Sequence, residues 1–176
     1  MSAWMFRVGD KVVYPNHGVG VIEQISSRNM GANMQQFYLL KIEASNLRVM
    51  VPLDNVDCVG MRPVAKPGDV AHILHYLQGG ECHSPSDWKG RFKENSEKMR
   101  TGAILQVAEV LKSLLQLHQV KPLSFREKKM LDRAVALLID EMATVQGIRV
   151  EDAMLLLRRH LDRAHLDLPN ADTADA

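Results

Sequence analysis

Trp88 and the cations around it are the residues of this chain best suited to contact a ligand, in a run that reads Ser-Pro-Ser-Asp-Trp-Lys-Gly-Arg-Phe-Lys from Ser84. Trp88 falls in the first turn of a predicted helix, and Arg91, three residues on, shares its face. Lys89 and Lys93 share a neighbouring face. A flat ring beside cations suits a DNA minor groove, because the ring can unstack a base step while the cations contact phosphates. The alternative is that Trp88 packs between helices and that the cations form a solvated face.

The charge balance limits how such a contact would work. The chain of 176 residues carries 22 basic and 21 acidic side chains, which excludes a broad basic coat that binds DNA by charge alone. Positive charge is local instead: the segment from Trp88 to Arg100 holds five basic residues against two acidic ones. Arg126 and Lys128 open a second predicted helix, which begins with a capping box at 124–127.

Patterns typical of catalysis and of metal binding are weak. No Ser-His-Asp arrangement, phosphate-binding loop or pair of carboxylates stands out in the sequence. The candidate metal ligands are His72, His75, Cys82 and His83, whose spacings are looser than those of a zinc site. We therefore expect no enzyme activity, no metal and no cofactor. A metal-dependent enzyme that uses these side chains is a distant alternative.

The composition is that of a globular protein, with 46% hydrophobic and 24% charged residues. Cys58 and Cys82 form no disulfide framework, which favours a reducing compartment. No apolar run approaches the roughly 20 residues needed to cross a bilayer. Arg7, Asp10 and Lys11 interrupt any signal-peptide core. We expect a cytoplasmic location.

The first 62 residues are predicted to be strands. Short β-branched and aromatic runs cover Lys11–Tyr14, 19–26, 36–43 and 47–53. Pro15-Asn16-His17-Gly18 predicts a tight turn, because Pro fixes φ while Asn and Gly accept positive φ. Gly20 is expected at a bulge or sharp bend. This pattern predicts a small, bent β-barrel of the Tudor-like or SH3-like type.

One edge of this barrel is a candidate for protein binding. Pro52 has no N–H to donate, so the last strand is expected at an edge, where a partner strand can add. Arg28 or Arg48 would then pair with acidic residues of the partner. Met50 lies on the same strand as Arg48. The alternative is that both arginines are ordinary surface residues.

Beyond residue 67 the apolar residues recur with the period of a helix. The predicted helices are 68–77, a helix from an N-cap at Ser84 to about Arg100, 104–117, a long helix that ends at Gly147, and 150–164. The expected fold class is α+β, with a bundle of about five helices after the barrel. The expected organisation is a domain at 1–62, a linker at 63–67, a helical domain at 68–168 and a flexible tail at 169–176.

Several motifs together resemble the CarD/CdnL family of bacterial transcription regulators. They are the opening run from Phe6 to Gly20, the pair Val51-Pro52, and the runs at 59–62, 88–95 and 123–131. These motifs keep their order over about residues 5–165. The opening motif also resembles the polymerase-binding module of transcription-repair coupling factors, which are large helicases. A chain of 176 residues has no room for their motor.

This resemblance implies a division of labour between the two halves. The barrel would bind the β subunit of bacterial RNA polymerase, and the helical domain would contact promoter DNA at the upstream edge of the melted region. The implied DNA contacts are Trp88, Lys89, Arg91, Lys93, Arg126 and Lys128, with Trp88 as a minor-groove wedge. The implied polymerase contacts are Arg28, Arg48, Met50 and Pro52. Met50 is a departure, because some relatives carry an arginine at this position.

The function that follows is a transcription regulator, a monomer in the complex, that stabilises the promoter open complex through largely sequence-independent DNA contacts. The alternative is a protein–protein adapter on RNA polymerase without direct DNA contact. In that case Trp88 would lie in the core or at a protein interface.

Overall fold

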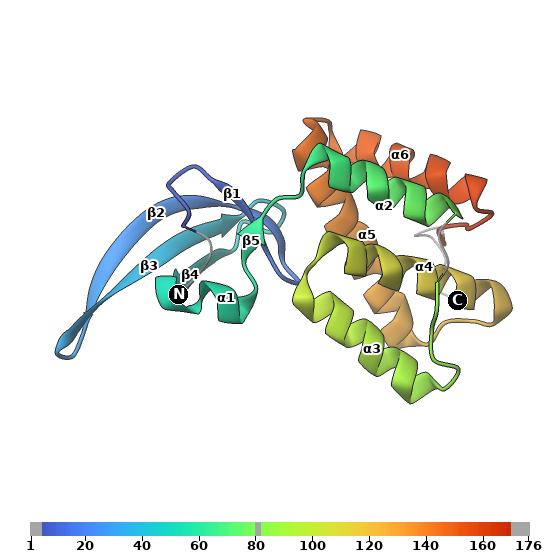
Figure 1. Cartoon of the computed structure of the whole chain (residues 1–176), viewed down its shortest axis with the longest axis horizontal. Helices are drawn as coiled ribbons and strands as arrows, with labels where there is room; N and C mark the ends of the chain where they lie inside the picture. The colour runs from blue at the N-terminus through green and yellow to red at the C-terminus, as the bar shows by residue number, and fades with distance from the viewer. Residues whose placement is uncertain (1–4, 80–81, 170–176) are drawn as a thin grey trace.

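An antiparallel sheet and a bundle of helices lie side by side in the computed structural model, which describes residues 5–79 and 82–169 (Figure 1). The sheet comes first in the chain and the bundle second, which confirms the predicted α+β class. Within the described residues, no helix is both long enough and apolar enough to span a membrane.

Five strands form one sheet in the order β4-β3-β2-β1-β5. Their bounds are β1 Lys11–Tyr14, β2 Gly18–Met30, β3 Asn33–Ile42, β4 Arg48–Pro52 and β5 Arg62–Pro63. β4 lies at an edge, as Pro52 predicted. The sheet does not close on itself, and its five antiparallel strands are roughly consistent with the predicted small barrel of the Tudor-like or SH3-like type. A 3-10 turn, η1 (Leu53–Asn55), and a one-turn helix, α1 (Val56–Val59), separate β4 from the two-residue β5, and the two edges do not pair.

The β2–β3 hairpin is longer than predicted and extends away from the bundle (Figure 1). Arg28 pairs with Gln35 near its tip, beyond the predicted end of the strand at about residue 26. The register shift predicted at Gly20 lies instead between Ile22 and Gln24. Gly20 has a different role: a Cβ there would come within 2.7 Å of the Leu40 side chain. A glycine is therefore needed for the close approach of β3.

One face of the sheet forms its hydrophobic core. Tyr38 closes this core at one end, where its hydroxyl accepts a hydrogen bond from the Phe6 N–H at 3.1 Å and its ring meets the Phe6 ring edge-on. The buried members are Phe6, Val12, Ile22, Tyr38, Leu40, Ile42, Val51, Val56 and Met61. Because strand side chains alternate between faces, the opposite face of β2, β3 and β4 is left toward solvent.

The five predicted helices of the second half are present. They are α2 (Pro67–Gly79), α3 (Trp88–Thr101), α4 (Ile104–Val120), α5 (Phe125–Gln146) and α6 (Val150–Arg163). The main core lies around α4, whose Val110, Leu111 and Leu114 are fully buried. It takes apolar residues from all five helices. A smaller cluster joins α2 to α5 and α6.

α3 begins later than predicted. Ser84 was the expected N-cap, but Asp87 caps the helix, and its carboxylate accepts a hydrogen bond from the Gly90 N–H at 2.7 Å. Trp88 is therefore the first helical residue. The predicted capping box of α5 is confirmed: Ser124 Oγ accepts from the Glu127 N–H at 3.3 Å, and Glu127 Oε2 accepts from the Ser124 N–H at 2.9 Å.

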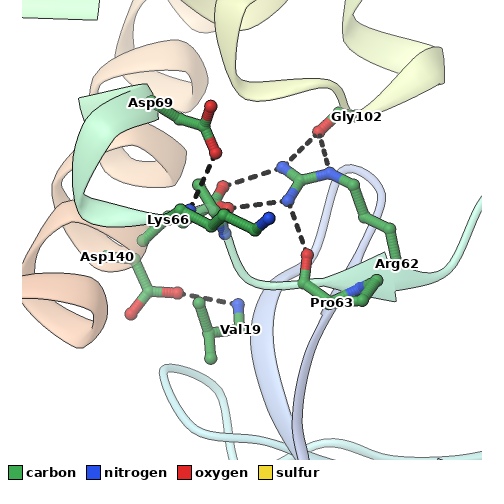
Figure 2. Close-up of polar contacts among 9 residues, drawn as sticks. Val19, Arg62, Pro63, Lys66, Asp69, Gly102 and Asp140 are labelled. Atoms are coloured by element: carbon green, nitrogen blue, oxygen red, sulfur yellow. Dashed lines mark hydrogen bonds and ion pairs between the residues drawn. The ribbon is translucent and has the colours of Figure 1, made fainter. Parts of the chain in front are cut away.

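The segment that joins the two halves is held firmly against the bundle (Figure 2). Arg62, in β5, donates two hydrogen bonds to Glu141 of α5, at 2.7 and 2.8 Å, and two to the Gly102 carbonyl, at 3.1 and 2.7 Å. Glu141 also accepts from the Ala65 N–H at 2.8 Å. Asp140 of α5 accepts from the Val19 N–H of β2 at 2.9 Å. The predicted linker at 63–67 is therefore an ordered connection fixed by α5.

Candidate nucleic-acid interface and sheet face

Trp88 lies at the surface, at the start of α3. It is 42% exposed, and its ring stacks on that of Phe92 one turn later, with centroids 5.8 Å apart and planes inclined by 17°. This is the offset geometry that aromatic pairs favour. Phe92 is half-buried beside Trp88. The alternative in which Trp88 packs inside the bundle does not describe this chain.

A third ring, which the sequence analysis did not single out, lies at the start of α5. Phe125 is 74% exposed, and Lys129 places its Nζ 5.4 Å from the centre of the Phe125 ring. The capping box that precedes it was visible in the sequence. The exposure of Phe125 could not be predicted, because phenylalanine is one of the residue types most often buried.

Arg91 is a correction to the predicted DNA contacts. It was placed on the exposed face with Trp88, but it is 4% exposed and lies inside the bundle. Its guanidinium pairs with Glu127 at 3.4 Å and donates to the carbonyls of Pro85 and Ser86, at 3.4 and 3.3 Å. Its Nε has no hydrogen-bond partner among the described residues. Arg91 therefore ties the start of α3 to the start of α5, and its side chain is only 5% exposed.

Glu127 is held in its charged form at this junction. Burial raises the pKa of this carboxyl, but the hydrogen bonds from Ser124 and the charge of Arg91 outweigh burial and lower the pKa below its ordinary value. Glu127 is thus both the capping residue of α5 and the counter-charge of Arg91. Only the first of these roles was predicted from the sequence.

The remaining predicted cations are exposed: Lys89 and Lys93 on α3, and Arg126 and Lys128 on α5. Two other basic residues of α3 are engaged on the surface. Lys98 pairs with Glu94 at 2.9 Å and with Glu109 at 3.1 Å, and Arg100 pairs with Glu97 at 3.0 Å. Because Arg91, Lys98 and Arg100 have acidic partners, the surplus of positive charge in this segment comes from Lys89 and Lys93, on the same helix as Trp88.

The four candidate protein-binding residues of the first half share one face of the sheet. Across the sheet, Met50 of β4 pairs with Leu39 of β3, and Leu39 pairs with Gln24 of β2. Pro52 of β4 pairs with Phe37 of β3. By the two-residue period of a strand, Arg28 and Arg48 lie on this same face. We call Arg28, Phe37, Leu39, Arg48, Met50 and Pro52 the outer sheet face. Phe37 and Leu39 were not selected from the sequence.

Arg48 is not free on this face, because it pairs with Glu23 of β2 at 3.0 Å. Met50 is 36% exposed beside it. Arg28 lies farther along the β2–β3 hairpin, two residues beyond Ser26. Ser26 of β2 pairs with Phe37 of β3, and Phe37 pairs with Pro52 of β4. The outer sheet face therefore runs diagonally from the edge strand to the hairpin tip.

The candidate metal ligands do not form a cluster. His72, His75 and His83 are exposed, and Cys82 Sγ lies 4.0 Å from the Glu109 carbonyl. No group of three or more histidine, cysteine or acidic side chains within the described ranges is arranged to hold a metal. Cys58 and Cys82 are both free thiols.

The chain thus combines an exposed aromatic and basic surface on a helical bundle with a sheet whose edge strand β4 is unpaired on one side within the described residues. Comparison with known proteins supports a role as a transcription factor. Residues 6–65 match the family described as "CarD-like/TRCF RID domain", and residues 72–158 match "CarD, C-terminal domain".

The chain is also 40% identical, over 144 residues, to YdeB of Bacillus subtilis (strain 168), a candidate transcription factor; the match covers 82% of this chain and 94% of YdeB. The chain therefore belongs to the CarD/CdnL family. The match to the RID domain implies interaction with RNA polymerase.

Proposed function

We propose that this protein stabilises the open promoter complex of bacterial RNA polymerase by placing Trp88 against the minor groove at the upstream edge of the melted DNA. The observation that carries the proposal is the exposed stack of Trp88 on Phe92, with Lys89 and Lys93 on the same helix. An apolar ring that enters a base step is most favoured where the duplex is already distorted. The neighbouring lysines supply phosphate contacts that do not depend on sequence.

The stacked geometry refines how the ring would act. Phe92 lies against one side of the indole. Trp88 would then act as a wedge at the last paired base step, with the Phe92 ring supporting it from behind. Arg126 and Lys128 of α5 would add backbone contacts beside it, while Arg91 would position α3 from within the bundle.

The outer sheet face would bind the β subunit of the polymerase. Phe37, Leu39, Met50 and Pro52 form an apolar row on it, and Arg28 and Arg48 supply charge. β4 offers a free backbone edge to which a strand of the partner could add. Met50 stands where some relatives carry an arginine, so this contact relies more on apolar packing. The proposed setting is the cytoplasm, with one copy of the chain in each polymerase complex.

The physical basis of this function is a shift between closed and open states. A ligand moves such an equilibrium only by its difference in affinity for the two states. A difference of about 1–2 kcal/mol changes the ratio of populations about five- to thirty-fold. Docking of the sheet on polymerase raises the local concentration of the bundle near DNA, so weak affinity for DNA is sufficient.

The test of the DNA role is the lifetime of the open complex measured with Trp88→Ala. We expect the stabilisation by the protein to fall about fivefold or more, while binding to polymerase is unchanged. Leu155→Ala is the matched control, because Leu155 is an exposed apolar residue on α6, 62% accessible. Equal lifetimes with Trp88→Ala and with the control would rule out the role of the ring.

Two further measurements separate this proposal from the adapter alternative. A photo-crosslinker placed at Lys89 should react with upstream promoter DNA in the polymerase complex, whereas an adapter that does not touch DNA would give no such product. Met50→Glu should weaken capture of the isolated β subunit, since it introduces a charge into the apolar row. Leu155→Glu should leave that capture unchanged.

A further inference from the structure

An apolar groove lies between α3 and α5, next to Trp88 but separate from it. Its volume is about 350 Å³, at the lower end of the roughly 300–1,000 Å³ of sites that take small ligands. Phe92, Met99 and Met130 provide apolar side chains along it, and Phe125 lines it from the start of α5. Asn16 of the β1–β2 turn also lines it.

The polar side chains of this groove include three cations from one helix. Arg126, Lys129 and Arg133 of α5 line it, and its lining contains no acidic residue. Positions 126, 129 and 133 are three and four residues apart, so the cations share one side of α5. An elongated ligand with apolar rings and a negatively charged backbone is complementary to such a groove.

The groove continues the surface already described. Phe92 stacks on Trp88 and also lines the groove, so the ring stack leads directly into it. Phe125 and Lys129 stand in cation–π contact at the groove, 5.4 Å apart. The buried pair of Arg91 and Glu127 keeps the starts of α3 and α5 together, and so fixes the spacing between the rings.

We propose that this groove binds an unpaired strand of DNA, with a base against Phe92 and Phe125 and its phosphates on Arg126, Lys129 and Arg133. The proposal rests on the proposed function, because an unpaired strand becomes available next to Trp88 only where the duplex has opened. In intact duplex the faces of the bases are covered by their neighbours. The groove would therefore favour melted DNA over paired DNA, in addition to the contact made by Trp88.

The experiment uses the full chain and three labelled DNAs in equilibrium binding at one fixed salt concentration. The first is a blunt duplex, the second the same duplex with an unpaired tail, and the third carries a tail of abasic nucleotides. The abasic tail keeps the phosphates and removes the rings. We expect the tail with bases to bind about fivefold or more tightly than the abasic tail, as base–aromatic stacking requires.

Variants locate the effect in the groove. Phe125→Ala should abolish the preference for bases over abasic sites, and its 74% exposure means that folding does not depend on it. Arg133→Ala should weaken binding of both tails equally and leave their ratio unchanged. Val120→Ala, which changes an 84% exposed apolar residue at the end of α4, is the matched control.

The outcomes distinguish this proposal from the function on which it rests. Equal binding of the two tails, or a preference that survives Phe125→Ala, overturns the groove proposal, as does crosslinking of the groove to a polymerase subunit in place of DNA. Neither result affects the open-complex test with Trp88→Ala. The protein could bind the tail with bases more tightly while its Trp88→Ala variant prolongs the open complex as well as the natural protein does. That pair of results would overturn only the role of Trp88.

Discussion

Arg62 in β5 and Glu141 in α5 form a two-bond ion pair across the junction of the sheet and the bundle, with N–O distances of 2.7 and 2.8 Å. Glu141 is 4% exposed, whereas the Arg62 side chain is 21% exposed. The same guanidinium holds the Gly102 carbonyl between α3 and α4. One arginine therefore connects the strand that ends the sheet to three helices of the bundle.

Arg62→Ala should destabilise the whole protein, because it leaves Glu141 buried without its counter-charge. We expect the free energy of unfolding in urea to fall by about 3 kcal/mol, the lower end for a broken buried pair, since Arg62 is partly exposed. Arg48→Ala breaks the exposed pair with Glu23 and should lower it by less than about 1 kcal/mol. If Arg62→Ala and Arg48→Ala lowered the free energy of unfolding equally, a structural role for the junction would be contradicted.

Glu127 gives the stability a predictable dependence on pH. Its folded pKa lies below the ordinary value of 4.5, so its contribution is present above that value and is lost as the pH falls through the folded pKa. Glu127→Gln should therefore be less stable than the natural protein at pH 7, and the difference should shrink below about pH 4. Glu97→Gln, which breaks an exposed pair with Arg100, should lower the free energy of unfolding by less than about 1 kcal/mol at pH 7.

Asp140 should show the opposite sign. Burial, helped by the charges of Glu43 and Glu141, raises the pKa of this carboxyl, although the Val19 N–H opposes the shift. A carboxyl whose folded pKa is raised stabilises the fold less as the pH rises through that pKa. Asp140→Asn keeps an acceptor for the Val19 N–H and should be more stable than the natural protein at pH 7, a gain that disappears in acid. Asp140→Ala leaves the Val19 N–H unpaired and should lose about 1–3 kcal/mol.

The salt dependence of DNA binding should separate surface cations from the buried one. Lys93→Ala and Lys128→Ala should each reduce the slope of log affinity against log salt by about one unit for each lost phosphate contact. Arg91→Ala should leave the slope unchanged, and should lower the free energy of unfolding by about 3 kcal/mol because Glu127 is left unpaired. A reduced slope with Arg91→Ala would show that Arg91 reaches DNA after all.

The element pattern was largely predictable because it is a local property. The periods of apolar residues located all five helices of the bundle, the capping box marked the start of α5, and Pro52 placed β4 at an edge. That the sheet stays open was not predictable, since this depends on where η1 and α1 take the chain after β4. A local pattern carries no information on how two distant strands meet.

The candidate site shows the same limit at the level of single side chains. Trp88 and Arg91 are three residues apart and were assigned to one exposed face. Arg91 is instead drawn inward by Glu127, which lies 36 residues away in the chain. Phe92 and Phe125 were missed for a related reason, because an aromatic residue in a helix is more often buried. Partners that are distant in sequence decide which of these side chains reach solvent.

The β2–β3 hairpin has a consequence for how docking could be observed. β4 pairs with β3 only as far as Phe37, so residues 33–36 of β3 have a partner strand on one side alone. A two-stranded ribbon is marginally stable in water. A strand contributed by polymerase could continue the line of β4 onto this vacant stretch. Those amide protons of residues 33–36 that point away from β2 would then exchange with solvent more slowly in the bound state, which reports that the added strand lies along this part of β3.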